Sequence, residues 1–278
     1  MVSINTEKKV AGAVFPGYMI DDFKYVSSIS NIHPNALTCN GIAISTVQTG
    51  MDCLIPAVPA INEVEEWVKE GLRHSGIDWN EFHSFGGRVI DSAADFLELL
   101  GYVPSCLDGK AAGWMLPFYN PKNGEELIGA DGMPYFRIRM RYPAQTADKK
   151  PAKYLSRKSS GQHAFILATV HEQLTHDPQT PLILTEGEKK AWCAVKHGLP
   201  VIGLTGNFGW SLPGTHELLP ELVHYLTAAR PVIIIWDSDA KGNRNFGLSS
   251  KRLATALLGF GSSLRHYPQT GKPVWTIF

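Results

Sequence analysis

Two short acidic motifs have the residue types and the spacing of a metal-dependent phosphoryl-transfer site. Glu186 is followed by a glycine and comes directly after the apolar run 181–185, and Asp237 and Asp239 form a D-x-D directly after the apolar run 231–236. Carboxylate oxygens are the ligands that Mg²⁺ prefers, and a bound Mg²⁺ can activate an attacking oxygen and stabilise a leaving one. We therefore predict that Glu186, Asp237 and Asp239 are catalytic residues that hold Mg²⁺ or Mn²⁺.

Short apolar runs that alternate with helical patterns predict the elements that place these acids. We expect strands at 181–185, 199–204, 231–236 and 262–267, and helices at 188–197, 218–229 and 246–258. Apolar strands that alternate with helices are typical of a parallel sheet covered on both faces. The strand at 231–236 is entirely apolar and is expected to be central. Because ligands bind beyond the carboxyl ends of such strands, both acidic motifs are expected at one edge of the sheet.

A basic and aromatic stretch precedes the predicted sheet. Apolar residues alternate with arginines over 136–141, which predicts a strand with one apolar face and one arginine face. Eight basic residues and one acid lie between residues 137 and 158, although the formal net charge of the whole chain is zero. Guanidinium groups suit phosphate oxygens, and a tyrosine ring offers a surface for base stacking. The predicted nucleotide-binding or nucleic-acid-binding residues here are Arg137, Arg139, Arg141, Lys153 and Tyr154. The alternative is a solvated strand face followed by a lysine-rich loop, since 143–163 is predicted to be a loop.

The segment before this stretch has a helical pattern. Apolar residues at 61, 64, 67, 68 and 72 predict a helix that Asn62 can cap. A second helix is expected near Asp91, ending at Gly101, with one short helix in the connector between the two. The inward residues expected for the second helix are Ala94, Phe96, Leu97 and Leu100.

Composition excludes several other classes of protein. The four cysteines form no C-x-x-C pair, which argues against a zinc ribbon and against a disulfide scaffold. The chain has no signal-peptide pattern and no apolar run long enough to cross a membrane, so we expect a cytoplasmic protein with reduced thiols and no membrane partner. A neutral chain must bind nucleic acid through a local patch, because its surface as a whole is not basic.

The sequences of these motifs resemble those of TOPRIM-like domains of the DUF3854 type, which occur in primases of phages and plasmids. The segments that carry the resemblance are TEGEKKA at 185–191, GLPVIGLTGNFGW at 198–210 and IIIWDSDAKGN at 233–243. It extends upstream through HSGID, LLGYV, GWMLPFYNP, FRIRMR and KYLSRKSSG, and it covers about residues 70–268. In that family the acids equivalent to Glu186, Asp237 and Asp239 bind the metal.

The resemblance implies an α/β fold: a TOPRIM-like parallel sheet flanked by helices, preceded by a small β-rich basic subdomain and a helical N-terminal region. The expected divisions are 1–58 of unknown role, 59–109 helical, 110–168 β-rich and basic, and 169–278 TOPRIM-like. By position in the motifs, Lys189, Lys190 and Asn207 join the predicted nucleotide-binding residues. The implied function is DNA primase-like nucleotidyl transfer on single-stranded DNA, with nucleoside triphosphates and Mg²⁺, in replication of a mobile element and with a replicative helicase as a further partner.

Two alternatives use the same acids differently. A TOPRIM nuclease would cut DNA with Mg²⁺ and without nucleoside triphosphates. A degenerate module would bind nucleic acid or a protein partner without catalysis. Relatives continue after the fourth strand with a K-G-x-D-D-like segment, whereas this sequence reads GKPVWTIF there, which favours the degenerate module modestly.

Overall fold

The computed structural model describes residues 14–15, 18–19, 62–146, 150–227, 230–236, 244–260 and 263–264. The chain divides into two compact units, Met1–Ala57 and Val58–Phe278. In the first unit, β1 (Val14–Phe15) pairs antiparallel with β2 (Tyr18–Met19). The second unit holds all the other elements named below, and the predicted divisions near residues 109 and 168 fall inside it.

The helical start of the second unit follows from its capping residues. Helix α1 (Glu63–Arg73) begins after Asn62, whose side chain accepts hydrogen bonds from the backbone amides of the first turn, so both the helix and its predicted cap are confirmed. The predicted short helix is α2 (Trp79–Ser84), which begins with a capping box between Asp78 and Glu81.

Helix α3 (Ala93–Leu100) is the second predicted helix, and it ends at Gly101 in the left-handed conformation, as expected. Phe96 and Leu100 are buried as predicted, whereas Ala94 is exposed and Leu97 is 54% exposed, so the predicted inward position of these two was wrong. The helix is only eight residues long and contacts the sheet along one narrow stripe, which leaves the side chains beside that stripe in solvent.

The first of two sheets is antiparallel, in the order β3-β4-β5-β6. Its strands are β3 (Arg88–Ile90), β4 (Gly113–Pro117), β5 (Phe136–Gln145) and β6 (Pro151–Leu155). The predicted alternation in β5 is confirmed, because its apolar side chains are buried and its arginines face the other side. The predicted loop at 143–163 was wrong in part, since β5 extends to Gln145 and 151–155 is a strand. Pro151 stands at the first position of this edge strand, where a missing N–H costs no ladder hydrogen bond.

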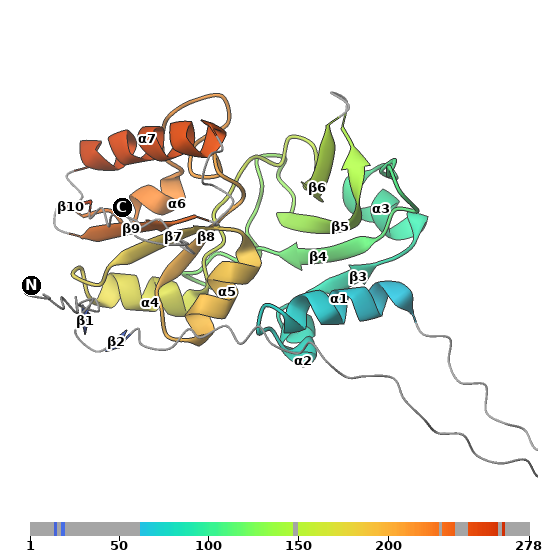
Figure 1. Cartoon of the computed structure of the whole chain (residues 1–278), viewed down its shortest axis with the longest axis horizontal. Helices are drawn as coiled ribbons and strands as arrows, with labels where there is room; N and C mark the ends of the chain where they lie inside the picture. Colours follow the sequence, from blue (N-terminus) through green and yellow to red (C-terminus); the bar gives the residue numbers. More distant parts are fainter. Residues whose placement is uncertain are drawn as a thin grey trace, which may run out of the picture. The chain divides into compact units, whose positions relative to one another are not determined.

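A parallel sheet lies beside the antiparallel one, in the order β10-β9-β7-β8 (Figure 1). Its strands are β7 (Leu182–Glu186), β8 (Val201–Leu204), β9 (Pro231–Ile235) and β10 (Ser263–Leu264), and every pairing is parallel. Strand β9 lies between two neighbours, as its apolar sequence predicted. The antiparallel sheet followed by a parallel sheet with interleaved helices confirms the predicted α/β, TOPRIM-like fold class.

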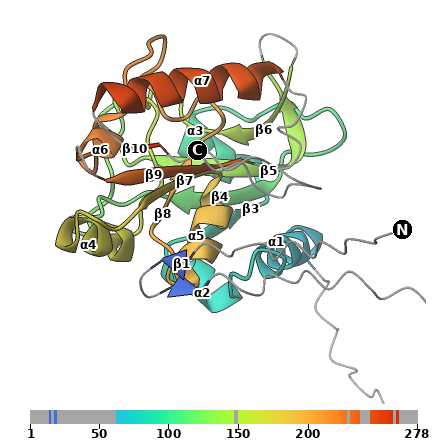
Figure 2. The same cartoon turned by 60° about the vertical axis from the view of Figure 1, so that its left-hand side comes forward.

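Helices cover both faces of the parallel sheet. They are α4 (Ala168–His176), α5 (Glu188–Lys196), α6 (Pro220–Val223) and α7 (Arg244–Gly259). Helices α5 and α7 lie on opposite sides of the sheet (Figure 2). Within the parts of the chain that the structure describes, no helix has the length and apolar character needed to cross a bilayer.

Helix α6 is much shorter than the predicted helix at 218–229. It begins at Pro220, whose ring suits a first helical position, and it ends at Val223 before a turn through Tyr225. The chain must then reach the start of β9 at Pro231, and the residue before a proline disfavours helical backbone.

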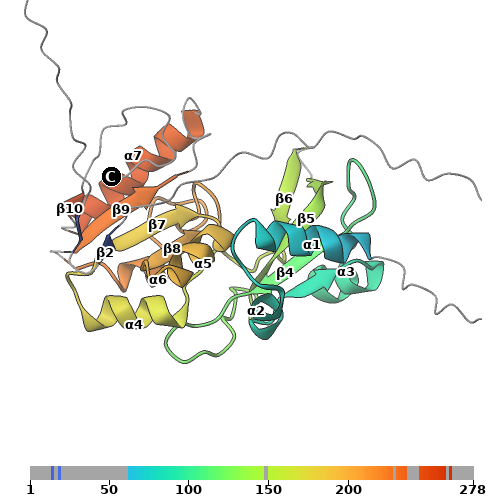
Figure 3. The same cartoon turned by 60° about the horizontal axis from the view of Figure 1, so that its bottom comes forward.

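Helix α5 lies between the parallel sheet and the α1–α2 pair (Figure 3). Lys189 donates a hydrogen bond of 2.8 Å to the carbonyl of Gly71, and Lys196 donates one of 2.7 Å to the carbonyl of Gly76. The indole N–H of Trp192 donates to the Glu81 carboxylate at 2.7 Å. Helix α5 is therefore attached to the α1–α2 pair from its first turn, at Lys189, to its last residue, Lys196.

Candidate functional site

Glu186 is the last residue of β7, and its position follows from the strand before it. Residues 182–185 are buried, while Glu186 is half-buried at the carboxyl edge of the sheet. The parallel register places Glu186 opposite Leu204 of β8, and the amide of Gly187 donates to the Leu204 carbonyl at 2.8 Å. Gly187 has a φ of 93°, which L-residues rarely adopt, so the chain can turn from strand into α5 directly after the carboxylate.

The two predicted aspartates, Asp237 and Asp239, lie outside the described residues. The structure describes their strand up to Trp236, whose buried indole donates to the Ser250 hydroxyl of α7 at 2.7 Å. Over the described ranges, no group of three or more His, Cys, Asp or Glu side chains is placed to hold a metal ion. Of the three predicted metal ligands, the described structure therefore places Glu186.

Glu188, which the sequence motifs did not single out as a site residue, joins α5 to β5 two positions after Glu186. Its side chain is 2% exposed, and its Oε1 accepts a hydrogen bond from Nη1 of Arg137 at 2.8 Å. A carboxylate in the first turn of a helix is favoured by the helix dipole, and this one also meets a guanidinium. One predicted phosphate-binding residue, Arg137, is thus engaged by an acid of α5.

Tyr154 of β6 lies under two of the predicted arginines. The guanidinium carbons of Arg137 and Arg139 lie 4.6 and 5.0 Å from the centre of its ring. Burial raises the pKa of the Tyr154 hydroxyl to about 12, with the carboxylates of Glu188 and Glu186 adding to the effect. The tyrosine therefore stays neutral over the physiological range and offers an aromatic face that attracts cations.

The predicted lysines differ in how far they are buried. Burial lowers the pKa of Lys189, and the nearby charge of Arg139 lowers it further. Lys190, next to it in α5, is half-buried, whereas Lys153 on β6 is exposed. Four cations and two carboxylates thus gather where β5, β6 and the start of α5 meet: Arg137, Arg139, Lys189, Lys190, Glu186 and Glu188. We call these six residues together with Tyr154 the seam cluster.

Two further predicted residues have other neighbours. Arg141 pairs at 3.5 Å with Glu63 of α1, and its guanidinium lies 5.3 Å from the ring centre of Tyr142. Asn207 follows β8 on the loop beyond the carboxyl edge, and its carbonyl accepts a hydrogen bond from the Ser249 hydroxyl. The structure therefore brings Arg137, Arg139, Tyr154 and the α5 lysines into direct contact or close range, with Arg141 further along the same strand.

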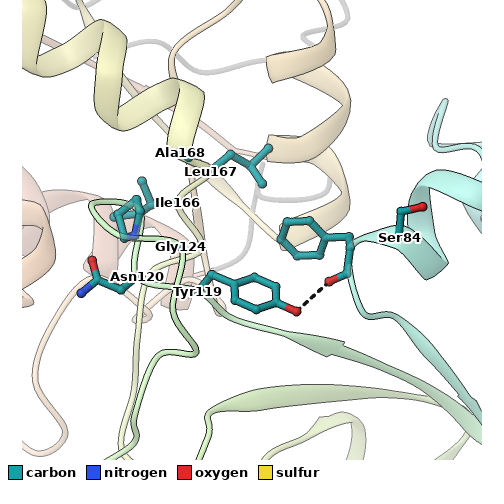
Figure 4. Close-up of a pocket in the computed structure, with 9 residues that line it drawn as sticks. Ser84, Tyr119, Asn120, Gly124, Ile166, Leu167 and Ala168 are labelled. Carbon is teal, nitrogen blue, oxygen red and sulfur yellow. Dashed lines mark hydrogen bonds between the residues drawn. The ribbon is translucent and has the colours of Figure 1, made fainter.

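A separate pocket of about 240 Å³ lies between the end of α2, the loop after β4 and the start of α4 (Figure 4). Its lining is largely apolar and includes Phe85, Tyr119, Ile166 and Leu167, and the Tyr119 hydroxyl donates to the Phe85 carbonyl at 3.1 Å. No residue of the seam cluster lines it. The acids and cations that could do phosphoryl chemistry are therefore elsewhere, at the end of β7.

Comparison with known proteins gives a family match over part of the chain. Residues 171–266 match the model of a domain of unknown function, DUF3854. The chain is also similar to the crystal structure of the zinc-binding and RNA polymerase domains of the Aquifex aeolicus primase, with a TM-score of 0.42 and 19% sequence identity over 70% of this chain and 48% of that one. No curated protein matches the chain. The parallel sheet from α4 to β10 is thus the part of the chain that is similar to the DUF3854 domain.

Proposed function

We propose that the chain is a metal-dependent nucleotidyltransferase of the primase type, which uses nucleoside triphosphates and Mg²⁺ to make short primers on single-stranded DNA. The observation that carries the proposal is the seam cluster. A carboxylate at the end of a buried parallel strand acts on a tyrosine ring that two arginines cover, and two lysines lie in the first turn of the helix that follows. Phosphoryl transfer needs both parts, since metal-bound carboxylates serve the reacting oxygens and fixed cations hold the phosphates.

The residues suit the metal that this chemistry uses. Glu186 supplies a carboxylate oxygen at the sheet edge, and the register of β7 with β9 brings the strand that precedes Asp237 and Asp239 to the same edge. Glu186, Asp237 and Asp239 would hold the Mg²⁺, because hard oxygen donors are its preferred ligands. When bound, the metal would neutralise charge that develops on the reacting phosphoryl group.

The chain's own residues would do the remaining work. Arg139, Lys189 and Lys190 would bind the phosphates of the triphosphate or of the template strand, and Tyr154 would support the arginines from below. Single-stranded nucleic acid is bound by this combination of a basic groove and aromatic rings. The arginines of β5, the ring of Tyr154 on β6 and the lysines of α5 support the proposal.

The test is a primer-synthesis assay with the full chain. Purified protein is incubated with a single-stranded template, labelled nucleoside triphosphates and Mg²⁺ or Mn²⁺, and the products are separated on a denaturing gel. Oligonucleotides that form with metal, disappear in EDTA and are absent with the Glu186→Gln variant are expected.

The same preparation separates the alternatives. Plasmid that is cut with Mg²⁺ in the absence of nucleoside triphosphates would show a nuclease and overturn the primase proposal. Metal-independent DNA binding with neither product would show a non-catalytic binding module and overturn it as well.

A further inference from the structure

A buried ion pair joins the arginine face of β5 to the first turn of α5. Arg137 and Glu188 are 51 positions apart in sequence, and their side chains are 13% and 2% exposed. The free energy needed to remove two charges from water often exceeds the free energy gained from their attraction. A protein with apolar residues of the same size at these positions would therefore commonly be as stable or more stable. The contribution of the pair to stability therefore does not by itself explain why it is placed here.

The pair holds the Arg137 guanidinium in one orientation. Glu188 accepts from one of its nitrogens at 2.8 Å, and the ring of Tyr154 lies 4.6 Å from its central carbon. A guanidinium carries five N–H donors in a rigid planar fork, so fixing one edge and one face also fixes the directions of the others. A fork that is oriented before the ligand arrives loses less conformational entropy when it binds a phosphate.

We propose, resting on the proposed function above, that Glu188 is a positioning residue: it holds Arg137 on Tyr154 so that Arg137 binds a phosphate group of single-stranded DNA beside Glu186. Glu188 itself does not touch the phosphate. By charge alone, Glu188 would be expected to weaken the binding of an anion. In this proposal the phosphate site requires Glu188.

The sign of one mutant effect tests the proposal. Glu188→Gln removes a negative charge next to a phosphate site, so electrostatics alone would tighten DNA binding. Positioning gives the opposite result, because Arg137 loses its charged partner and its fixed orientation. Binding is measured by fluorescence anisotropy with a labelled oligothymidylate in EDTA, which keeps catalysis out of the readout. We expect Glu188→Gln to weaken binding about tenfold, the scale of one charged hydrogen bond.

A double variant shows whether the effect passes through Arg137. Residues that act as one unit give non-additive changes, so Arg137→Ala combined with Glu188→Gln should bind no more weakly than Arg137→Ala alone. The matched control is Glu63→Gln, which removes the acid beside Arg141 on the same strand. Glu63 is 82% exposed and holds its arginine at 3.5 Å, so this variant should bind as well as the wild type or slightly better.

Each outcome decides the proposal. Unchanged or tighter binding by folded Glu188→Gln, or additive losses in the double variant, would overturn it. If thermal melting shows that Glu188→Gln does not fold, Glu188→Asp takes its place: the charge is kept and the carboxylate is withdrawn by one methylene, so weaker binding supports positioning and unchanged binding overturns it. Wild-type protein that binds the oligonucleotide but makes no primers would remove the proposed function and leave this inference standing, whereas wild type that does not bind it would overturn both.

Discussion

Thr185 of β7 and Ile235 of β9 lie opposite each other in neighbouring parallel strands. The residues that follow them, Glu186 and Trp236, therefore reach the carboxyl edge of the sheet at the same level. Parallel strands present their ligand-binding loops at this edge. The acidic motif at 237–239 begins one residue beyond Trp236, so this register is the structural basis for expecting a shared metal site.

Asp237→Asn should remove metal-dependent stabilisation without lowering the stability of the metal-free protein. Carboxylates that share a site repel one another when no metal is bound, so loss of one charge should leave the melting temperature in EDTA unchanged or slightly raised. Stabilisation by Mg²⁺ should vanish, because the metal loses a ligand. Thermal melts with and without Mg²⁺ measure both effects, with Glu172→Gln on the exposed face of α4 as the control. Equal destabilisation in both buffers, with no metal effect on the wild type, would contradict the metal site.

Replacing Arg137, Arg139 and Arg141 with alanine should weaken binding to single-stranded DNA and flatten its salt dependence. For every phosphate that an arginine no longer neutralises, the slope of log K against log salt should fall by about 0.7, because fewer counterions are released. Arg139→Ala alone should show part of this effect and leave the ion pair between Arg137 and Glu188 intact. Arg88→Ala, which removes an arginine that pairs with Asp95 and Glu98 near α3, should leave the slope unchanged. A triple variant with the wild-type slope would remove these arginines from the binding face.

Gly113→Ala should destabilise the protein, and Gly247→Ala should stabilise it. A Cβ at Gly113 in β4 would overlap the carbonyl oxygen of Arg139 in the next strand, and forcing the strands apart costs about 1–3 kcal/mol. A Cβ at Gly247 in α7 meets no atom within 4 Å. Alanine there should stabilise the protein by about 0.4–1 kcal/mol, because it lowers the conformational entropy of the unfolded chain. Urea titration of both variants gives the two signs. Equal stability of Gly113→Ala and wild type would show that β4 approaches β5 less closely than this spacing requires.

Asp131→Asn should destabilise the protein at neutral pH and leave its stability unchanged in acid. The hydrogen bond from Arg157 at 2.5 Å lowers the pKa of the Asp131 carboxyl below its ordinary value of 3.8. A lowered folded-state pKa contributes stability above the unfolded value, and this contribution is lost as the pH falls through the folded value. The difference in melting temperature between wild type and Asp131→Asn should therefore be constant near neutral pH and shrink as the pH falls through 3.8 and below it. Asp108→Asn, at an exposed position, serves as the reference, and a gap that widens in acid would contradict the assignment.

The sequence predicted the elements whose signals are local. Asn62 before an apolar stripe and Gly101 after one mark the ends of α1 and α3, and the alternation over 136–141 marks β5. Elements without such signals were missed. Helix α4 begins after Leu167 with no side-chain cap, and β6 begins with a proline inside a polar run. Strand β6 exists because β5 offers it a partner, and that pairing is not visible in its own five residues.

The candidate site shows the same division. The place of Glu186 at the end of β7 could be predicted because a carboxylate after an apolar strand is a local pattern. Glu188 could not, because an acid in the first turn of a helix is common, and only the fold brings Arg137 to it across 51 residues. The arginine row on β5 was predicted as one surface, yet Arg137 and Arg141 meet different acids on different helices.

The attachment of α5 to α1 and α2 sets an order of events during protein synthesis. Lys189, Trp192 and Lys196 bond to Gly71, Glu81 and Gly76, which leave the ribosome more than 100 residues earlier. The antiparallel sheet has its own apolar cluster and pairs each strand with the next one along the chain, so it can form on a nascent chain. The α1–α2 surface that α5 contacts therefore stays uncovered until α5 has been translated.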